Sequence, residues 1–285
     1  MRADPRELPI AVFDSGVGGL TVLHECLVAL GHEDFLYLGD TARFPYGTCA
    51  QAELEAYAVE LAELLVERGA KLLVVACNSA TAAALPRLRA AFGDRVGIVG
   101  VVEPEAEVAA GLTRTGEVGL LATPATVASG AYDRALRRVA RRARLHGVAC
   151  PDLASLIQEG GDVDERIVAS VDAACVPLRR AHVDTVILGC THYGLVGPVI
   201  RRALGRSVRV VTSGEAVVGR IERELAARGL ARPERPDTPR GAYSFLCSGD
   251  PGEFRRLGTR FLQLPLGPVE HVPVVPVGAD ERRAA

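Results

Sequence analysis

The sequence predicts an α/β fold with two pseudo-symmetric domains, each built on a mainly parallel sheet flanked by helices. Three observations support this prediction. Short runs rich in Val, Ile and Leu alternate with longer stretches of helical period, a pattern typical of parallel sheets covered on both faces. Two strand ends that carry cysteine resemble each other far apart in the chain. The length of 285 residues suits two domains of similar size.

Strands and helices are expected to alternate along the chain. The apolar runs predict strands near residues 10–14, 35–38, 72–76, 97–101, 117–121, 184–188 and 208–211. The helical stretches predict helices near 18–30, 50–68, 79–92, 125–143, 163–181, 194–204 and 215–228. A Pro- and Gly-rich segment at 229–241 predicts a surface loop. A short strand from Tyr243 and a helix from Pro251 follow, and the tail from Gly278 is expected to fray.

Two of the predicted strand ends look alike. LLVVACNSAT at 72–81 and TVILGCTHYG at 185–194 each run from aliphatic residues to a cysteine and polar side chains, and the two cysteines lie 113 positions apart. Two further strand ends, at Asp14 and Thr123, lie 109 positions apart. Similar offsets indicate a pseudo-repeat in which each half donates a cysteine to a shared cleft. Chance similarity between two buried strands would give the same apolar runs and stays open as the alternative.

The pseudo-repeat also predicts the domain boundaries. Residues 1–101 together with 212–285 form the first α/β domain, to which the C-terminal segment returns, and residues 102–211 form the second. Ligands of open α/β sheets bind at the carboxyl ends of the strands. We therefore expect the active site in the cleft between the two domains.

Composition argues against several classes of function. The formal net charge is −2, whereas nucleic-acid binders normally carry a basic surplus. The apolar runs are far shorter than the roughly 20 residues that span a bilayer, and the N-terminus shows no apolar leader, so we expect a cytoplasmic protein without membrane association. Seven cysteines without a C-x-x-C pair argue against a disulfide framework or a zinc ribbon.

Cys77 and Cys190 are the candidate catalytic thiols. Each stands where a strand enters a loop, and polar residues follow it at once. Backbone N–H groups and helix N-termini near such a thiol are expected to lower its pKa and to give thiolate near neutral pH. The alternative is a small buried hydrophobe, the usual environment of cysteine. We assign that structural role to the other cysteines, which are Cys26, Cys49, Cys150, Cys175 and Cys247.

Asp14 ends the first predicted strand, and the glycine-rich SGVGG at 15–19 follows it. The N–H groups that open the next helix can hold an anion. The third glycine comes too early for a dinucleotide fingerprint, so a carboxylate site fits better. A tight turn without a ligand remains the alternative.

Two other groups could assist the thiols. The loop that ends in Pro45, Tyr46 and Gly47 offers backbone N–H groups and a phenol for a substrate carboxylate, although a plain turn explains its residues equally well. His192 lies two residues past Cys190, close enough in a turn to share a proton with it. A zinc site of both thiols and His192 is geometrically conceivable, but the spacing is not that of zinc ligands.

Five motifs, in the same order, resemble those of the glutamate racemases of the aspartate/glutamate racemase superfamily. They are DSGVGG at 14–19, GDTARFPYG at 39–47, ACNSAT at 76–81, LLATPATVASGAY at 120–132 and GCTHYG at 189–194. The resemblance covers most of residues 8–275. It implies an isomerase that interconverts L- and D-glutamate without a cofactor or a metal. It also implies that the D-glutamate supplies peptidoglycan synthesis, and hence the cell wall and cell shape.

The resemblance further implies roles for individual residues. Cys77 and Cys190 match the two catalytic thiols, of which Cys77 serves D-glutamate and Cys190 L-glutamate. Asp14 and His192 match their supporting acid/base groups. The implied substrate contacts are Asp14, Ser15, Tyr46, Gly47, Asn78, Ser79, Thr191 and His192.

Four positions depart from the family pattern. Gly194 stands where proline is usual, Ser79 where threonine is usual, and Thr212 where many members have aspartate. Gln158 stands where many members have a glutamate that assists the second half-site, and Glu159 is its neighbour. Whether Gln158 or Glu159 takes part in proton handling stays open.

Two cysteines suit this reaction, because racemisation removes the Cα proton from one face and returns a proton to the other. One thiolate and one thiol must therefore flank the substrate. Pyridoxal phosphate offers another route but needs a Schiff-base lysine, and Lys71, the only lysine, opens a strand on the side away from the cleft. The sequence thus predicts a small-molecule substrate and no cofactor.

Two alternative functions stay open. An aspartate or other small-acid racemase of the same superfamily would use the same residues with a different pocket. A non-catalytic two-lobed ligand-binding module would keep its ligand when either thiol becomes serine. The oligomeric state also stays open, with a homodimer as one option.

Overall fold

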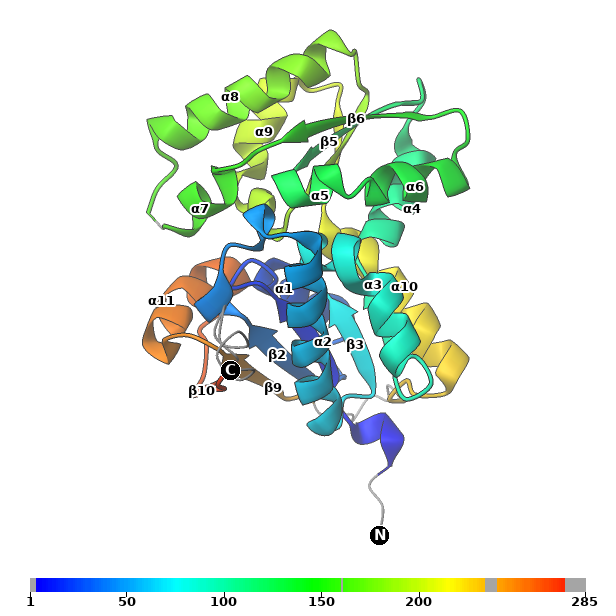
Figure 1. Cartoon of the computed structure of the whole chain (residues 1–285), viewed down its shortest axis with the longest axis vertical. Helices are drawn as coiled ribbons and strands as arrows, with labels where there is room; N and C mark the ends of the chain where they lie inside the picture. The colour runs from blue at the N-terminus through cyan, green and yellow to red at the C-terminus, as the bar shows by residue number, and fades with distance from the viewer. Residues whose placement is uncertain (1–3, 160, 234–239, 275–285) are drawn as a thin grey trace, which may run out of the picture.

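Two parallel sheets form the frame of the computed structural model, which describes residues 4–159, 161–233 and 240–274 (Figure 1). The first sheet contains β1 (Ile10–Asp14), β2 (Phe35–Gly39), β3 (Leu72–Val75), β4 (Gly97–Gly100), β9 (Tyr243–Cys247) and β10 (Val269–His271). The second sheet contains β5 (Glu117–Ala122), β6 (Arg144–Ala149), β7 (Thr185–Gly189) and β8 (Arg209–Val211). All strand pairs in both sheets are parallel.

Helices flank both sheets, and the two lobes lie one above the other in Figure 1. The lower lobe carries α1 (Leu20–Ala29), α2 (Gln51–Glu67), α3 (Asn78–Phe92), α10 (Ser213–Arg228) and α11 (Pro251–Leu262). The upper lobe carries α4 (Val102–Leu112), α5 (Pro124–Ala128), α6 (Ala131–Val139), α7 (Leu153–Gln158), α8 (Glu165–Arg180) and α9 (Gly197–Leu204). Short 3-10 helices are η1 (Pro5–Glu7), η2 (Thr41–Arg43), η3 (Tyr46–Thr48) and η4 (Thr191–Val196). No helix among the described residues combines the length and the apolar character needed to cross a bilayer.

The core forms on both faces of the first sheet because its central strands are apolar on both sides. In β1, Ile10 and Val12 join the apolar cluster that includes α1, whereas Ala11 and Phe13 join the cluster that includes α2 and α3. Every residue of β1 is buried. This two-sided burial explains why the central strands appear in the sequence as continuous aliphatic runs rather than as alternating ones.

The two sheets share one strand order. Within the first sheet the order β2-β1-β3-β4 corresponds to β6-β5-β7-β8 in the second. β3 therefore corresponds to β7, and Cys77 and Cys190 lie just past the ends of these two strands. The predicted fold of two pseudo-symmetric α/β halves is confirmed.

The chain crosses between the lobes twice, once from β4 into α4 and once from β8 into α10. The six-stranded sheet draws its strands from residues 10–100 and 243–271, and the four-stranded sheet draws its strands from 117–211. We therefore propose the domain boundaries 1–101 with 212–285 and 102–211, because each sheet falls within one of these segments.

Several elements differ from the sequence prediction. The predicted helix at 125–143 is wrong, because Gly130 adopts a left-handed conformation with φ of 64° and separates α5 from α6. Residues 144–149 form the edge strand β6, which was not predicted, and neither were α4 and α7. The predicted helix at 194–204 begins with the 3-10 turns of η4. The loop at 229–241 is described only at its ends, which contain neither helix nor strand, and the tail from Gly278 lies outside the described residues.

Candidate active site

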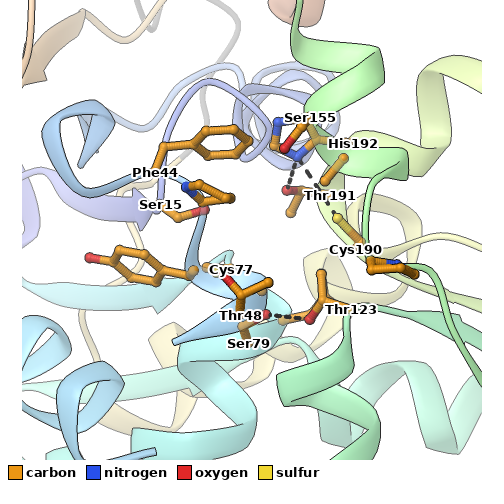
Figure 2. Close-up of a pocket in the computed structure, with 16 residues that line it drawn as sticks. Ser15, Phe44, Thr48, Cys77, Ser79, Thr123, Ser155, Cys190, Thr191 and His192 are labelled. Carbon is orange, nitrogen blue, oxygen red and sulfur yellow. Dashed lines mark hydrogen bonds between the residues drawn. The ribbon is translucent and has the colours of Figure 1, made fainter. Parts of the chain in front are cut away.

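A small pocket between the lobes contains both thiols. Cys77 caps the start of α3 in the first lobe, and Cys190 caps the start of η4 in the second. Figure 2 shows Cys77 and Ser79 on one side of this pocket and Cys190 and Thr123 on the other. The cavity has a volume of about 20 Å³, enough for about one water molecule. The lobes must therefore separate to admit an amino acid.

Most of the residues predicted for the site line this pocket. Besides the two thiols, the lining includes Ser15, Tyr46, Gly47, Asn78, Ser79, Thr191 and His192. Asp14 is fully buried and lies outside the lining. The carboxylate of Asp14 accepts hydrogen bonds from the backbone N–H of Gly16 at 3.0 Å and from the hydroxyl of Thr191 at 3.2 Å. Asp14 thus lies behind the residues that line the pocket, and its hydrogen bond with Thr191 links the two lobes.

The expected lowering of the thiol pKa is wrong for this structure. Burial and, to a smaller extent, the nearby charge of Asp14 raise the pKa of Cys77 to about 12, while hydrogen bonds from Ala80 and Ser15 only partly oppose these effects. Burial also raises the pKa of Cys190 well above its usual value, against a hydrogen bond from the backbone of His192. Both thiols are therefore protonated in the closed pocket. Backbone N–H groups do lower the pKa of both thiols, as predicted. Their effect is smaller than that of desolvation, because the two lobes exclude water from the thiols.

His192 contacts Cys190 through one nitrogen of its ring. Its Nδ1 lies 3.8 Å from the Cys190 sulfur, and its Nε2 lies 3.0 Å from the amide oxygen of Gln158. An amide oxygen can only accept, so Nε2 carries the hydrogen and Nδ1 is left as an acceptor for the thiol. Burial lowers the pKa of His192 to about 3, which keeps the ring neutral. Phe44 and Phe261 pack against the ring at centroid distances of 5.4 and 5.2 Å.

Hydroxyl groups close one wall of the pocket. The Ser79 hydroxyl lies 2.9 Å from that of Thr123 and 3.0 Å from that of Thr126, and these two threonine hydroxyls are also 3.0 Å apart. Ser79 belongs to α3, whereas both threonines belong to the second lobe. Gly47 lies close to the same wall, since a Cβ there would come within 2.8 Å of the Thr123 side chain. Such neutral hydroxyl groups can each donate a hydrogen bond to a carboxylate.

The phenol of Tyr46 is directed differently from the prediction. It donates a short hydrogen bond to the buried carboxylate of Asp40, which also accepts from Arg43 at 2.6 Å and from Ser248 at 2.6 Å. Its hydroxyl is therefore engaged below the pocket rather than offered to a substrate. Tyr46 contributes the rest of its surface to the lining.

Sequence reasoning missed several lining residues. They are Phe44, Pro45, Thr48, Thr123, Pro151, Ala154 and Ser155. Thr123 follows β5 directly, and the sequence marked it as a strand end without assigning it to the site. Ser155 lies on α7, a helix that the sequence analysis did not predict.

The described residues contain no cluster of three or more His, Cys, Asp and Glu side chains that could hold a metal ion. Of the three residues considered for a zinc site, Cys190 and His192 are in contact with each other. Its length of 3.8 Å fits a weak hydrogen bond of a thiol.

Comparison with known proteins agrees with this arrangement. A sequence model of the family described as Asp/Glu/Hydantoin racemase matches residues 15–221. A protein of Beutenbergia cavernae named glutamate racemase is 43% identical over 263 residues, which cover 90% of each chain. Fold, site and relatives define an amino-acid racemase, which is an isomerase. The chain belongs to the Asp/Glu/hydantoin racemase family.

Solved structures lead to the same family. A glutamate racemase of Bacillus anthracis, isoform RacE1, superposes with a TM-score of 0.89 at 33% identity and covers 94% of this chain and 98% of its own. A glutamate racemase of Francisella tularensis in complex with D-glutamate has a TM-score of 0.83 at 27% identity, with the same coverage. The two-lobed fold is therefore that of solved glutamate racemases.

Proposed function

We propose that this chain is a cofactor-independent glutamate racemase in which Cys77 and Cys190 exchange protons with the two faces of the substrate Cα. The observation that carries the proposal is the pair of thiols that line one pocket from equivalent strand ends of opposite lobes. Relatives named glutamate racemase at 43% identity support glutamate as the substrate.

The reaction needs one thiolate and one thiol at a time. The thiolate sulfur takes the Cα proton, the electron pair of the broken C–H bond stays on the substrate as a carbanion, and the opposite thiol donates its proton to the other face. The roles of the thiols exchange in the reverse direction. Because the Cα–H is a weak acid, donors to the substrate carboxylate must stabilise the developing charge. Ser15, Asn78, Ser79 and Thr191 are the side chains that we assign to substrate binding, together with the backbone of Tyr46 and Gly47.

A thiolate must first form from a buried thiol. His192 Nδ1 is the acceptor that we assign to the Cys190 proton, because the contact with Gln158 leaves this nitrogen unprotonated. Ser15 hydrogen-bonds to Cys77 and to Asp14, so we assign Asp14 as the supporting group on that side. The ammonium group of a bound amino acid adds a positive charge, which favours a thiolate near it.

The metabolic role follows from the product. We infer that the enzyme works in the cytoplasm and that its D-glutamate supplies peptidoglycan synthesis and so supports cell shape. A strain that lacks the gene is expected to require D-glutamate for growth. Growth without it, in a strain with no other source of D-glutamate, contradicts this role.

A homodimer is a further proposal, which sedimentation analysis tests.

Substitution of each thiol tests the mechanism. We expect Cys77→Ser and Cys190→Ser to fold and to lose at least about 99% of racemisation, because general acid/base groups contribute about 10²- to 10⁴-fold each. Cys49→Ser is the control, since Cys49 is partly exposed and lies outside the lining. Circular dichroism tests folding and optical rotation measures turnover. More than a tenth of wild-type turnover in either folded variant contradicts the two-thiol mechanism.

Deuterium incorporation separates two bases from one. In D₂O the first product from either enantiomer should carry deuterium at Cα, because the product-side thiol exchanges with solvent while the substrate hydrogen remains on the other sulfur. Recovered substrate should stay protiated at low conversion. Proton NMR measures both. Substantial protium in the early product indicates a single base.

Substrate choice separates the remaining alternatives. We expect kcat/KM for glutamate to exceed that for aspartate by at least about tenfold, because a shorter side chain leaves polar groups of the pocket unpaired. Equal values favour a broader small-acid racemase. Binding of glutamate without any Cα exchange favours the non-catalytic ligand-binding module.

A further inference from the structure

A buried carboxylate lies next to the pocket, at the junction of the lobes. Glu105 on α4 is fully buried. It accepts short hydrogen bonds from the hydroxyls of Tyr132 and Ser213, and the amide nitrogen of Asn78 lies 3.2 and 3.3 Å from its two oxygens. The same amide nitrogen donates to the Tyr132 hydroxyl at 2.7 Å. These four residues, Asn78, Glu105, Tyr132 and Ser213, form the Glu105 cluster.

The cluster joins the two places where the chain crosses between lobes. Glu105 lies in the first turns of α4, which follows the crossing from β4, and Ser213 is the first residue of α10, which follows the crossing from β8. Tyr132 belongs to α6 of the upper lobe and Asn78 to α3 of the lower lobe. One carboxylate therefore holds groups from both lobes and from both crossings.

The cluster also reaches the segments that carry the thiols. Asn78 follows Cys77 directly and lines the pocket. The Tyr132 ring packs below Gly189, the residue before Cys190, where an added Cβ would lie 3.3 Å from the ring. A shift of Glu105 would therefore be transmitted to both cysteine loops.

The chemistry of the cluster argues against a purely structural role. Glu105 receives hydrogen bonds from three neutral groups and is fully buried, whereas buried carboxylates are normally paired with a cation. Burial raises the pKa of Glu105 to about 7, although the three hydrogen bonds oppose this. Such an energetically costly group is more common at functional sites than in ordinary cores.

We propose that Glu105 is a positioning residue for racemisation, which fixes the Asn78 amide at the pocket wall and holds the two cysteine loops at their working separation. This proposal rests on the proposed function. With its amide nitrogen bound to Glu105 and Tyr132, Asn78 keeps one orientation, in which its amide oxygen faces the Ser213 hydroxyl at 3.5 Å. Glu105 acts through Asn78 and does not itself line the pocket.

A double-mutant cycle tests whether Glu105 acts through Asn78. We expect Glu105→Ala to lower kcat/KM for glutamate about a hundredfold, the loss that a displacement of about 1 Å produces. Asn78→Ala should cost at least as much. The double variant should be no more than about threefold worse than Asn78→Ala alone, because groups that act as one unit are not additive. Glu105→Gln, which keeps one acceptor oxygen, should restore part of the activity.

Controls separate positioning from loss of folding. Glu107→Gln removes a carboxylate from the same helix, which pairs with Arg220 at the surface, and should change kcat/KM less than twofold. If Glu105→Ala does not fold, Ser213→Ala and Tyr132→Phe each remove one donor and enter the same cycle with Asn78→Ala. Losses that multiply in the double variants, or a wild-type kcat/KM in Glu105→Ala, overturn the proposal. A wild-type chain that does not racemise glutamate instead contradicts the proposed function.

Discussion

The two ring nitrogens of His192 have different partners, and this difference fixes the tautomer of the ring. Gln158 accepts from one nitrogen, and the thiol of Cys190 faces the other. An uncharged acceptor fixes the tautomer without stabilising the protonated ring. A carboxylate in the place of Gln158 would do both.

This comparison gives a prediction for Gln158. We expect Gln158→Glu to raise the pKa of His192 above its value of about 3, by about 1 to 3 units, because a carboxylate beside Nε2 favours the imidazolium. Titration of the ring by proton NMR measures the shift, with His192→Gln to assign the signal. Gln158→Met removes the acceptor without adding charge and is the control. An unchanged His192 pKa in Gln158→Glu contradicts the assigned contact.

At the residue scale, the sequence located the thiols and most of the residues around them, but not the protonation of the thiols or the partner of the Tyr46 phenol. Cys77 and Cys190 could be found because the same apolar-to-cysteine pattern occurs twice. Their protonation could not, because it depends on water exclusion by the opposite lobe. The hydrogen bond from the Tyr46 phenol to Asp40 could not be predicted for a similar reason. The carboxylate of Asp40 also accepts from Ser248, which lies more than two hundred residues later in the chain.

At the scale of elements, the loop from β1 to α1 illustrates how glycine permits close packing. Gly18 lies directly against the second lobe. A Cβ at this position would come within 2.4 Å of the His192 ring and of the Thr191 hydroxyl. The glycine-rich segment thus allows the backbone of one lobe to approach the loop of the other lobe that carries Thr191 and His192.

Alanine at Gly18 should therefore disturb both stability and activity. We expect Gly18→Ala to displace His192 and Thr191, to lower kcat/KM between about tenfold and a hundredfold, and to cost about 1 to 3 kcal/mol of stability. Gly194→Ala is the matched control, because a Cβ there meets no atom within 4 Å. Kinetic assays and urea unfolding measure the two effects. Equal behaviour of the two variants contradicts the close approach.

Two of the elements that the sequence did not predict, β6 and α7, lack the usual sequence signals. β6 is an edge strand with a mostly exposed or half-buried pattern and carries Arg144, His146 and Gly147 in place of an aliphatic run. α7 is only six residues long, too short to show a helical period. The central strands were predicted to within one or two residues because burial on both faces demands aliphatic side chains throughout.

At the scale of the whole molecule, the two lobes are similar in topology but joined asymmetrically. Both chain crossings meet at the Glu105 cluster, whereas the lobes meet at the pocket through side-chain contacts, such as those of Ser79 with Thr123 and of Phe44 with His192. A cavity of about 20 Å³ requires the lobes to part for substrate entry. Because both chain crossings lie at the cluster, we infer that the cluster side acts as the hinge when the lobes part.

Burial at this junction also determines how stability depends on pH. The pKa of Glu105 is raised from 4.5 to about 7, and that of Asp14 from 3.8 to about 6, in both cases mainly by burial. A carboxyl group whose pKa is higher in the folded state binds protons more readily when folded. Its contribution to stability is fully present below the unfolded pKa and is lost as the pH rises through the folded pKa. His192 acts in the opposite direction, because burial lowers its pKa from 6.5 to about 3.

Because these groups oppose one another, the decisive comparison is between the wild type and a variant that removes one of them. We expect the difference in the free energy of unfolding, Glu105→Gln minus wild type, to be more positive at pH 8 than at pH 4.5, by on the order of 3 kcal/mol for the shift of Glu105. Urea unfolding at the two pH values measures this difference. Glu107→Gln, with its carboxylate at the surface, should show no comparable change. A pH-independent difference between Glu105→Gln and wild type would mean that Glu105 titrates alike in the folded and unfolded chains, and that water reaches the junction between the lobes.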